Sequence, residues 1–427
     1  MSNVRALLQN AAVYSVSNIL NAVIPFLLLP ILTRVLPPSE YGVIAMFTAT
    51  LGIMGAFTGL SVHGAVNVRY VDRDKIDFPR YVGSCLWVLL SSTFITLAVV
   101  TVFLAPLSKF AAVPPFWLLI AVLVSCCNFL NQIRLGIWMM ASRPALYGAF
   151  QVAQSAVNMG LSLVFVLIMH QGYAGRLWGL TLATVLFATS GVVSLAKAGW
   201  VRFCPHLEYM RETLSFGLPL VPHVLGIFLM GVVDRFVINQ KFGLGQAGIY
   251  MVAVQLSLGM SVVADAFNKA FVPWLYSLLN NDDLVSKHRL VRGTWIYFLI
   301  ALGIAGTVAL LSHWIIYIVA GAKYVGAAGA LSGLAFGQAF GGMYLMVTNY
   351  IFYARKTRPL AMVTFVSGVL GFGLLWVLIP LLGIAGAGLA NAITMFVRFL
   401  LTWALAQRVC PMPWLSFGKI EVKTQAI

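Results

Sequence analysis

The sequence predicts an all-α polytopic membrane protein with about twelve transmembrane helices in two six-helix bundles. Of its 427 residues, 61% are hydrophobic and only 9% are charged, whereas a soluble domain is about half apolar and about a quarter charged. Apolar runs long enough to cross a hydrocarbon core about 30 Å thick recur along the whole chain, and short polar stretches separate them. No large soluble domain fits between these runs.

The apolar runs follow one another in order. The first is too long for a cleavable signal region, so we expect it to persist as a membrane helix. The predicted spans are residues 10–32, 42–67, 81–105, 115–138, 146–169, 175–196, 215–239, 247–273, 293–320, 327–353, 360–380 and 384–407.

The net charge of +16 is explained by membrane topology. If the N-terminus is cytoplasmic, the inward loops and the C-terminal tail carry most of the Lys and Arg residues, as cytoplasmic loops do. The outward loops hold only Arg34, Lys109, Arg176, Lys241 and Lys323. We therefore expect both termini to be cytoplasmic, with membrane lipids as partners and no nucleic-acid partner.

Motifs for catalysis, nucleotides and metals are missing from the sequence. There is no Walker-type loop and no HExxH or GxSxG element, and the five cysteines lack metal-ligand spacing. We expect no enzymatic activity, no cofactor and no metal.

The two halves of the sequence repeat short segments in the same order. LPPSEYGVIAM at 36–46 leads into the second span as FGLGQAGIYM at 242–251 leads into the eighth, which superimposes Gly42 on Gly248. SRPALYGAF at 142–150 recurs as TRPLAMVTF at 357–365.

An even number of spans in each half makes the halves parallel repeats, and a pair of such bundles leaves a central cleft for substrate. The predicted division is an N-terminal bundle at 1–200, a cytoplasmic linker at 201–213, a C-terminal bundle at 214–409 and a cytoplasmic tail at 410–427.

Several stretches resemble Wzx-type polysaccharide flippases, members of the multidrug/oligosaccharidyl-lipid/polysaccharide exporter superfamily. The resemblance lies in FGLPLVPHVLGIFLMGVVDRFVI at 216–238, GLGQAGIYMVAVQLSLG at 243–259 and GIAGAGLANAI at 383–393. It implies a V-shaped pair of bundles that moves undecaprenyl-pyrophosphate-linked oligosaccharide across the bacterial inner (cytoplasmic) membrane by alternating access. The product would be a surface polysaccharide, such as the O-antigen of lipopolysaccharide or an exopolysaccharide, and a polysaccharide polymerase and a chain-length regulator would be partners.

Four basic residues within or near the spans are candidates for binding the pyrophosphate: Arg134, Arg235, Lys269 and Arg398. A cation at the centre of a membrane helix costs about 2.5 to 3.5 kcal/mol on insertion scales. Arg398 lies mid-span with no acid nearby in sequence, so it is the strongest candidate. Arg134 is close to the cytoplasmic end of its helix, where snorkelling is an alternative to substrate binding.

Asn18 and Asn21 belong to a polar stripe on one face of the first helix. A stripe of amides is costly against lipid, so it faces either the glycan or a neighbouring helix to which it donates hydrogen bonds. The sequence leaves both interpretations open.

Coupling and gating residues are predicted at two charged pairs and a helix break. Asp265 and Lys269 are spaced to pair on one helical face. Asp234 and Arg235 are adjacent, so we expect them to point to different neighbours: Arg235 to the cleft or the partner bundle, and Asp234 to a basic group on another helix, where it helps to hold the outward gate. The alternative is a stabilising cap at the membrane boundary. Pro219 and Pro222 should break the start of the seventh helix.

Two other functions fit the same architecture. An ion-coupled antiporter for cationic drugs, of the MATE type, would show an acid-rich cleft, whereas basic residues match or outnumber acids in these spans. A polysaccharide polymerase or ligase would carry a long outward loop with catalytic residues, and the outward loops are short.

Overall fold

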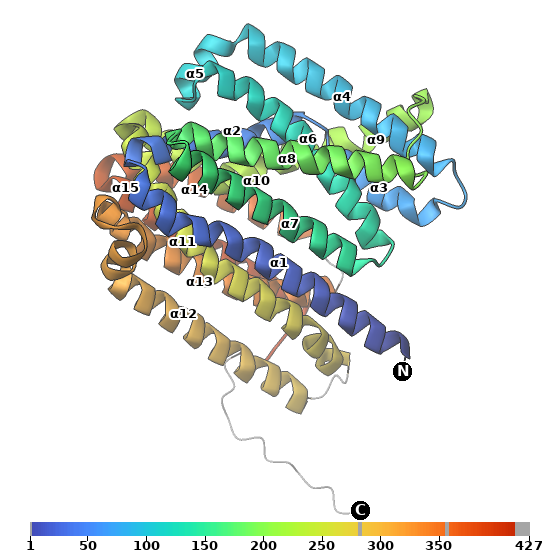
Figure 1. Cartoon of the computed structure of the whole chain (residues 1–427). Helices are drawn as coiled ribbons and strands as arrows, with labels where there is room; N and C mark the ends of the chain where they lie inside the picture. The colour runs from blue at the N-terminus through green and yellow to red at the C-terminus, as the bar shows by residue number, and fades with distance from the viewer. Residues whose placement is uncertain (1, 281–283, 355–357, 415–427) are drawn as a thin grey trace, which may run out of the picture. The chain divides into compact units, whose positions relative to one another are not determined.

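The computed structural model describes residues 2–280, 284–354 and 358–414. Within these ranges the chain is helical apart from short connections and forms no strand, so the predicted all-α fold is confirmed (Figure 1). The helices are α1 (Ser2–Val35), α2 (Pro38–Phe57), α3 (Val62–Arg69), α4 (Phe78–Val102), α5 (Leu104–Ala111), α6 (Pro115–Met140), α7 (Pro144–Leu163), α8 (Gly172–Lys197), α9 (Leu207–Gly217), α10 (Val221–Gly231), α11 (Val233–Asn280), α12 (Leu284–Ala320), α13 (Ala328–Tyr353), α14 (Arg358–Leu382) and α15 (Ile384–Val409).

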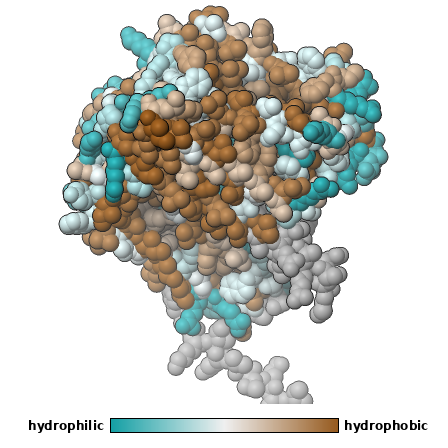
Figure 2. All heavy atoms as spheres, in the orientation of Figure 1, coloured by the Kyte–Doolittle hydropathy of each residue, from teal (hydrophilic) through white to brown (hydrophobic). Residues whose placement is uncertain are grey.

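The membrane-spanning character of the chain is visible in both length and surface. Eleven helices of the described residues are long and apolar enough to cross a membrane. The face drawn in Figure 2 is covered mostly by apolar residues, and polar residues gather at its margins. A protein with this surface is stable in hydrocarbon and not in water.

The predicted seventh span does not form a single long helix. α9 ends at Gly217, a 3₁₀ turn covers Leu218–Leu220, and α10 is followed by a second break at Val232, whose φ is −140°. The break expected at Pro219 and Pro222 is present, because proline supplies no N–H to a helix. The break at Val232 has no proline and was not predicted.

The predicted second span is also interrupted, so the expectation of one helix over 42–67 was wrong. α2 ends at Phe57, and Gly59, Leu60 and Ser61 have φ of 82°, 42° and 56° before α3 begins. A run of left-handed residues cannot continue a right-handed helix. The apolar pattern alone does not reveal this turn.

Packing divides the chain into two compact units. Unit 1 is residues 1–252 with 316–326, and unit 2 is residues 253–315 with 327–427. These units follow the contacts between helices, so the division at 201–213 inferred from the sequence repeat stays a prediction. Each unit has its own apolar core. Buried residues of the two cores include Val62, Phe78, Leu89 and Ile133 in unit 1 and Phe271, Phe298, Met346 and Phe399 in unit 2.

Two glycines that the sequence repeat superimposes make reciprocal contacts within unit 1. A Cβ placed on Gly42 would collide with the backbone carbonyl of Leu244, and a Cβ placed on Gly248 would collide with that of Pro38. Pro38 precedes Gly42 by as many residues as Leu244 precedes Gly248. The contact is therefore the same from both sides, and it agrees with the alignment of the two repeats.

Candidate functional site: intramembrane cations and their partners

A ridge of glycines brings α13 and α15 of unit 2 together. Gly329, Gly333 and Gly337 follow at steps of four along α13 and meet Ala385, Gly388 and Asn391 of α15. Small residues at this spacing allow two membrane helices to approach closely. Because the residue numbers of the contacts increase together along α13 and α15, the two helices run in the same direction.

Arg398 lies on α15 about two turns beyond this ridge. Its guanidinium carbon is 3.9 Å from the centre of the Tyr344 ring, which is contributed by α13. The ring supports the charge through a cation–π contact. The Nε of Arg398 is buried and has no hydrogen-bond partner among the described residues, and no carboxylate described in the structure lies within ion-pair distance of the side chain. Arg398 therefore keeps an unneutralised charge near the middle of its helix.

Asp265 and Lys269 of α11 form the pair that their spacing predicts. Lys269 Nζ is 2.6 Å from Asp265 Oδ2, and the two side chains are 50% and 52% exposed. Asn268, the residue before Lys269 on the same helix, accepts a hydrogen bond of 2.7 Å from Asn349 of α13. The spanning helices of unit 2 hold one described carboxylate, Asp265, and a larger number of cations: Lys269 and Arg398 away from the helix ends, and Lys287, Arg289, Arg292, Arg358 and Arg408 nearer to them.

The expectation for Asp234 and Arg235 was wrong, because the two side chains bind each other. Arg235 Nη1 is 3.3 Å from Asp234 Oδ1, and the side chains are 9% and 13% exposed. Asp234 lies in the first helical turn after the break at Val232, where backbone N–H groups lack helical partners. Its Oδ1 accepts the Arg235 N–H at 2.8 Å, which folds the carboxylate back toward its neighbour.

Further hydrogen bonds fix this pair across the break. Arg235 Nη1 donates to the carbonyl oxygen of Gly231, the last residue of α10, at 2.6 Å. Tyr250 donates its hydroxyl to Asp234 Oδ2 at 2.6 Å. The pair joins the end of α10 to α11, and Nη1 of Arg235 is bound to protein groups in these contacts. A role of Arg235 in substrate binding stays a prediction.

Removing the Tyr250 hydroxyl should destabilise the protein. In a Tyr250→Phe variant Asp234 loses a buried bond to a charged group, which costs about 1.5 to 3 kcal/mol. Tyr353→Phe is a matched control, because Tyr353 donates to Asn280 at an exposed site. We expect thermal denaturation of the purified protein at a lower temperature for Tyr250→Phe only. Equal melting of the two variants would show that the buried bond contributes nothing.

Arg134 is enclosed by protein side chains close to the end of α6, and snorkelling toward the membrane surface stays a prediction for it. The residue is 6% exposed, its Nη2 donates to Ser194 of α8 at 2.7 Å, and its guanidinium lies 3.9 Å from the Trp138 ring centre. The contacts hold α6 against α8. A role in substrate binding stays a prediction for this residue.

The polar stripe of α1 faces a neighbouring helix at one of its two candidate residues. Asn21 accepts a hydrogen bond from Ser155 of α7, as the alternative of interhelical bonding predicts, while Asn18 is half-buried. A second polar contact nearby was missed. Arg176, assigned to an outward loop from sequence, donates from α8 to Asn158 and Ser162 of α7 at 2.5 and 2.8 Å.

The structure thus brings Asp234 to Arg235 and Asp265 to Lys269. Among the residues it describes, no hydrogen bond or ion pair joins Arg398 or Arg134 to either pair. The aromatic partners Tyr344, Tyr250 and Trp138 were not predicted. Trp138 lies four residues after Arg134 on α6, so helical spacing could have found it. Tyr344 lies on a different helix from Arg398, and nothing in the sequence marks such a neighbour.

Comparisons with known proteins agree on fold and family. A family model described as polysaccharide biosynthesis protein matches residues 7–279, more than half of the chain. Lsg locus protein 1 of Haemophilus influenzae is 23% identical over 393 residues, with 85% of this chain and 88% of that protein covered. An uncharacterised membrane protein of the same organism is 24% identical over 380 residues, with 87% and 90% covered.

Solved structures share the fold at low identity. The lipid II flippase MurJ in an inward closed conformation has a TM-score of 0.74 at 13% identity, covering 92% of this chain and 87% of that chain. An inward-facing MATE family multidrug resistance transporter of the MOP superfamily has a TM-score of 0.70 at 14% identity, covering 92% and 94%. The fold is therefore that of the MOP-superfamily transporters, as the sequence predicts.

Proposed function

Because the chain belongs to the polysaccharide biosynthesis protein family, we propose that it is a flippase for a lipid-linked glycan. The cargo is an undecaprenyl-pyrophosphate-linked oligosaccharide, which moves from the cytoplasmic to the outer leaflet of a bacterial inner membrane by alternating access. Both termini are cytoplasmic. The exported unit then serves the assembly of a surface polysaccharide, with a polymerase and a chain-length regulator acting after it.

The unpaired charge of Arg398 is the observation that carries this proposal. A pyrophosphate is an anion that must cross hydrocarbon, and a guanidinium binds phosphate oxygens through parallel N–H donors. The stacking of Arg398 on Tyr344 leaves the Nε of Arg398 without a protein partner. An anion that accepted this donor would offset the cost of keeping a cation in the membrane.

The Asp265–Lys269 pair supplies a second cation and a titratable group. An ion pair of this exposure contributes little to stability, so Lys269 can exchange its carboxylate for a phosphate at low cost. The freed Asp265 would then be available to a proton or a cation, which is how the pair would couple transport to an ion gradient.

A MATE-type drug antiporter is less well supported. A site for cationic drugs needs carboxylates in excess, whereas the spanning helices of unit 2 hold a single described carboxylate, Asp265, against several cations. The charge balance favours an anionic cargo.

The test is the leaflet distribution of the glycan in cells depleted of the protein. Undecaprenyl-pyrophosphate-linked glycan is labelled in intact spheroplasts with a probe that cannot cross the membrane. Depletion should shift the glycan to the cytoplasmic face, and the wild-type gene should restore outward labelling. Unchanged outward labelling in a strain without a redundant flippase would overturn the proposal.

A further inference from the structure

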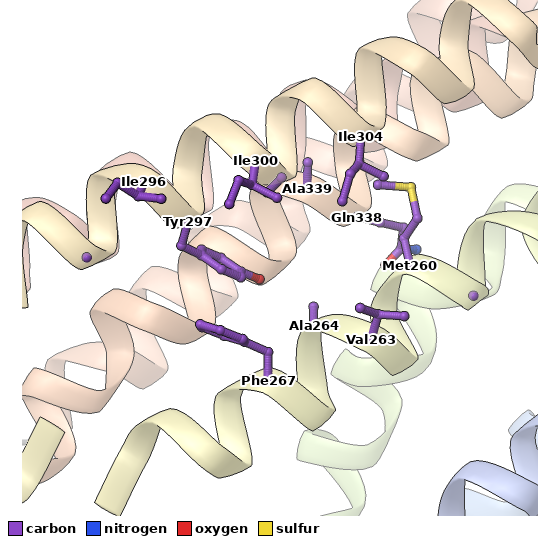
Figure 3. A pocket seen from close by; sticks show the side chains of 13 residues that line it. Met260, Val263, Ala264, Phe267, Ile296, Tyr297, Ile300, Ile304, Gln338 and Ala339 are labelled. Carbon is purple, nitrogen blue, oxygen red and sulfur yellow. The ribbon is translucent and has the colours of Figure 1, made fainter. Parts of the chain in front are cut away.

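Unit 2 contains an apolar crevice of about 440 Å³ between α11, α12 and α13. Figure 3 shows side chains of α11 facing those of α12 across it. The two walls are formed chiefly by Met260, Val263, Phe267, Ile296, Ile300 and Ile304. Tyr297 and Gln338 contribute the polar groups of an otherwise apolar lining, and no charged residue lines it.

The crevice is long and narrow. Ile296, Ile300 and Ile304 follow at steps of four and form one ridge of α12, which spans roughly 12 Å along the helix axis. Phe267 stacks on Tyr297 with ring centres 4.8 Å apart and an angle of 18° between the planes, toward one end. Met260, Ile304 and Gln338 lie toward the other end (Figure 3). This shape fits an extended chain better than a compact ligand.

The described residues leave much of the crevice lining exposed. Val263 is 66% exposed and Ile300 is 55% exposed, although both lie in helices that can span a membrane. Hydrocarbon is the material available to cover apolar side chains at that depth. Leu310 of α12 is 84% exposed but does not line the crevice, so bulk lipid covers it without holding one chain in place.

The opposite side of α11 has a different character. Successive helical residues are rotated by about 100°, so Asp265 and Lys269 lie nearly opposite Val263 and Phe267. α11 therefore has an apolar side toward α12 and a charged side away from the crevice. The apolar side could contact the hydrocarbon tail of an amphiphile, and the charged side, through Lys269, could contact its anionic head.

We infer that this crevice binds the prenyl chain of the lipid carrier. The inference rests on the proposed function, which supplies a prenyl carrier as cargo. A prenyl chain bears methyl branches at regular intervals, and these pack between the isoleucines of the α12 ridge, while its double bonds meet the Phe267 and Tyr297 rings. The straight acyl chains of the surrounding phospholipids lack both features and bind less tightly.

Photolabelling tests this site without any transport step. The full chain is placed in nanodiscs of phosphatidylethanolamine and phosphatidylglycerol with a trace of polyprenyl phosphate that carries a diazirine on its chain. Adducts should concentrate on peptides containing 260–267 and 296–304 and fall about tenfold in Ile300→Trp, which fills the crevice. Leu310→Trp, the matched control on the same helix, should leave them unchanged. Excess unlabelled polyprenyl phosphate should compete, and excess phosphatidylglycerol should not.

Two results would overturn the inference. One is labelling spread evenly over exposed apolar residues such as Leu299 and Leu310, and the other is equal competition by phosphatidylglycerol, because both mean that bulk lipid fills the crevice. Melting temperatures are measured first, and Val263→Trp replaces Ile300→Trp if the latter does not fold. Selective labelling together with a negative leaflet assay would reject the proposed function alone, whereas flipping without selective labelling would reject the prenyl site alone.

Discussion

Replacement of Arg398 by alanine should reduce outward transport of the lipid-linked glycan by at least about tenfold while leaving the amount of folded protein unchanged. The guanidinium carries an intramembrane charge that no described carboxylate neutralises and rests on the Tyr344 ring. Each hydrogen bond to a charged group contributes about 1.5 to 3 kcal/mol, so loss of one such bond reduces transport by about tenfold to a hundredfold. The leaflet assay, normalised to protein level, measures the effect.

Three further variants separate an anion-binding role from a structural one. Arg398→Lys keeps the charge but loses paired donation, so it should retain part of the transport. Tyr344→Phe keeps the ring and should resemble wild type, whereas Tyr344→Leu should not. Arg408→Ala is the matched control, since Arg408 is an exposed arginine in the last turn of the same helix. Full transport by Arg398→Ala at wild-type protein level would exclude the site.

Alanine at Gly42 or at Gly248 should each destabilise the protein by about 1 to 3 kcal/mol. The added Cβ collides with a backbone carbonyl, of Leu244 in the first case and of Pro38 in the second, and a backbone cannot rotate away as a flexible side chain can. A loss of stability would identify the collision, because a Gly→Ala change inside a helix otherwise stabilises a protein by about 0.5 to 1 kcal/mol. Thermal denaturation of the purified variants gives the measurement.

Gly245 provides the control for this pair. It lies between Leu244 and Gly248 in sequence, and nothing would contact a Cβ placed on it, so Gly245→Ala should be neutral or stabilising. The Gly42→Ala, Gly248→Ala double variant should cost less than the sum of the single variants, because the first collision already separates the segments. Three glycine variants with identical melting would show that the close approach is dispensable.

Hydropathy predicted the spans well where one helix buries one continuous apolar run, as α4, α6, α8 and α15 do. It failed where the backbone conformation changes inside an apolar stretch. The left-handed residues 59–61 and the turn at Val232 keep the same apolar composition as the helices beside them. An apolar composition predicts that a segment lies in the membrane, but it says little about the backbone angle φ of each residue. Proline is the exception, because its ring fixes φ and it has no N–H to donate. The break at Pro219 was therefore predicted, and the one at Val232 was not.

In the candidate site, too, some contacts could be predicted from the sequence and others could not. Asp265 and Lys269 are one turn apart on one helix, so their pairing follows from helical geometry. The depth of Arg398 follows from its place in its span. Tyr344 is on a different helix, and only the packing of α13 on α15 sets it beneath the guanidinium. For Asp234, helical spacing gave the wrong partner because the helix begins anew at Val233.

The reciprocal contact of Gly42 and Gly248 also bears on how such a chain arises. In an isologous interface, residue i of one copy contacts residue j of the other, and residue j of the first contacts residue i of the second. Two identical subunits related by a two-fold axis form an interface of this kind. Here both copies belong to one polypeptide, and the same glycine meets the same backbone position from each side. A half-length ancestor with this segment could have formed a homodimer through it, and fusion of the two genes would have preserved the contact while freeing each half to diverge, so that Arg398 arose on one side only.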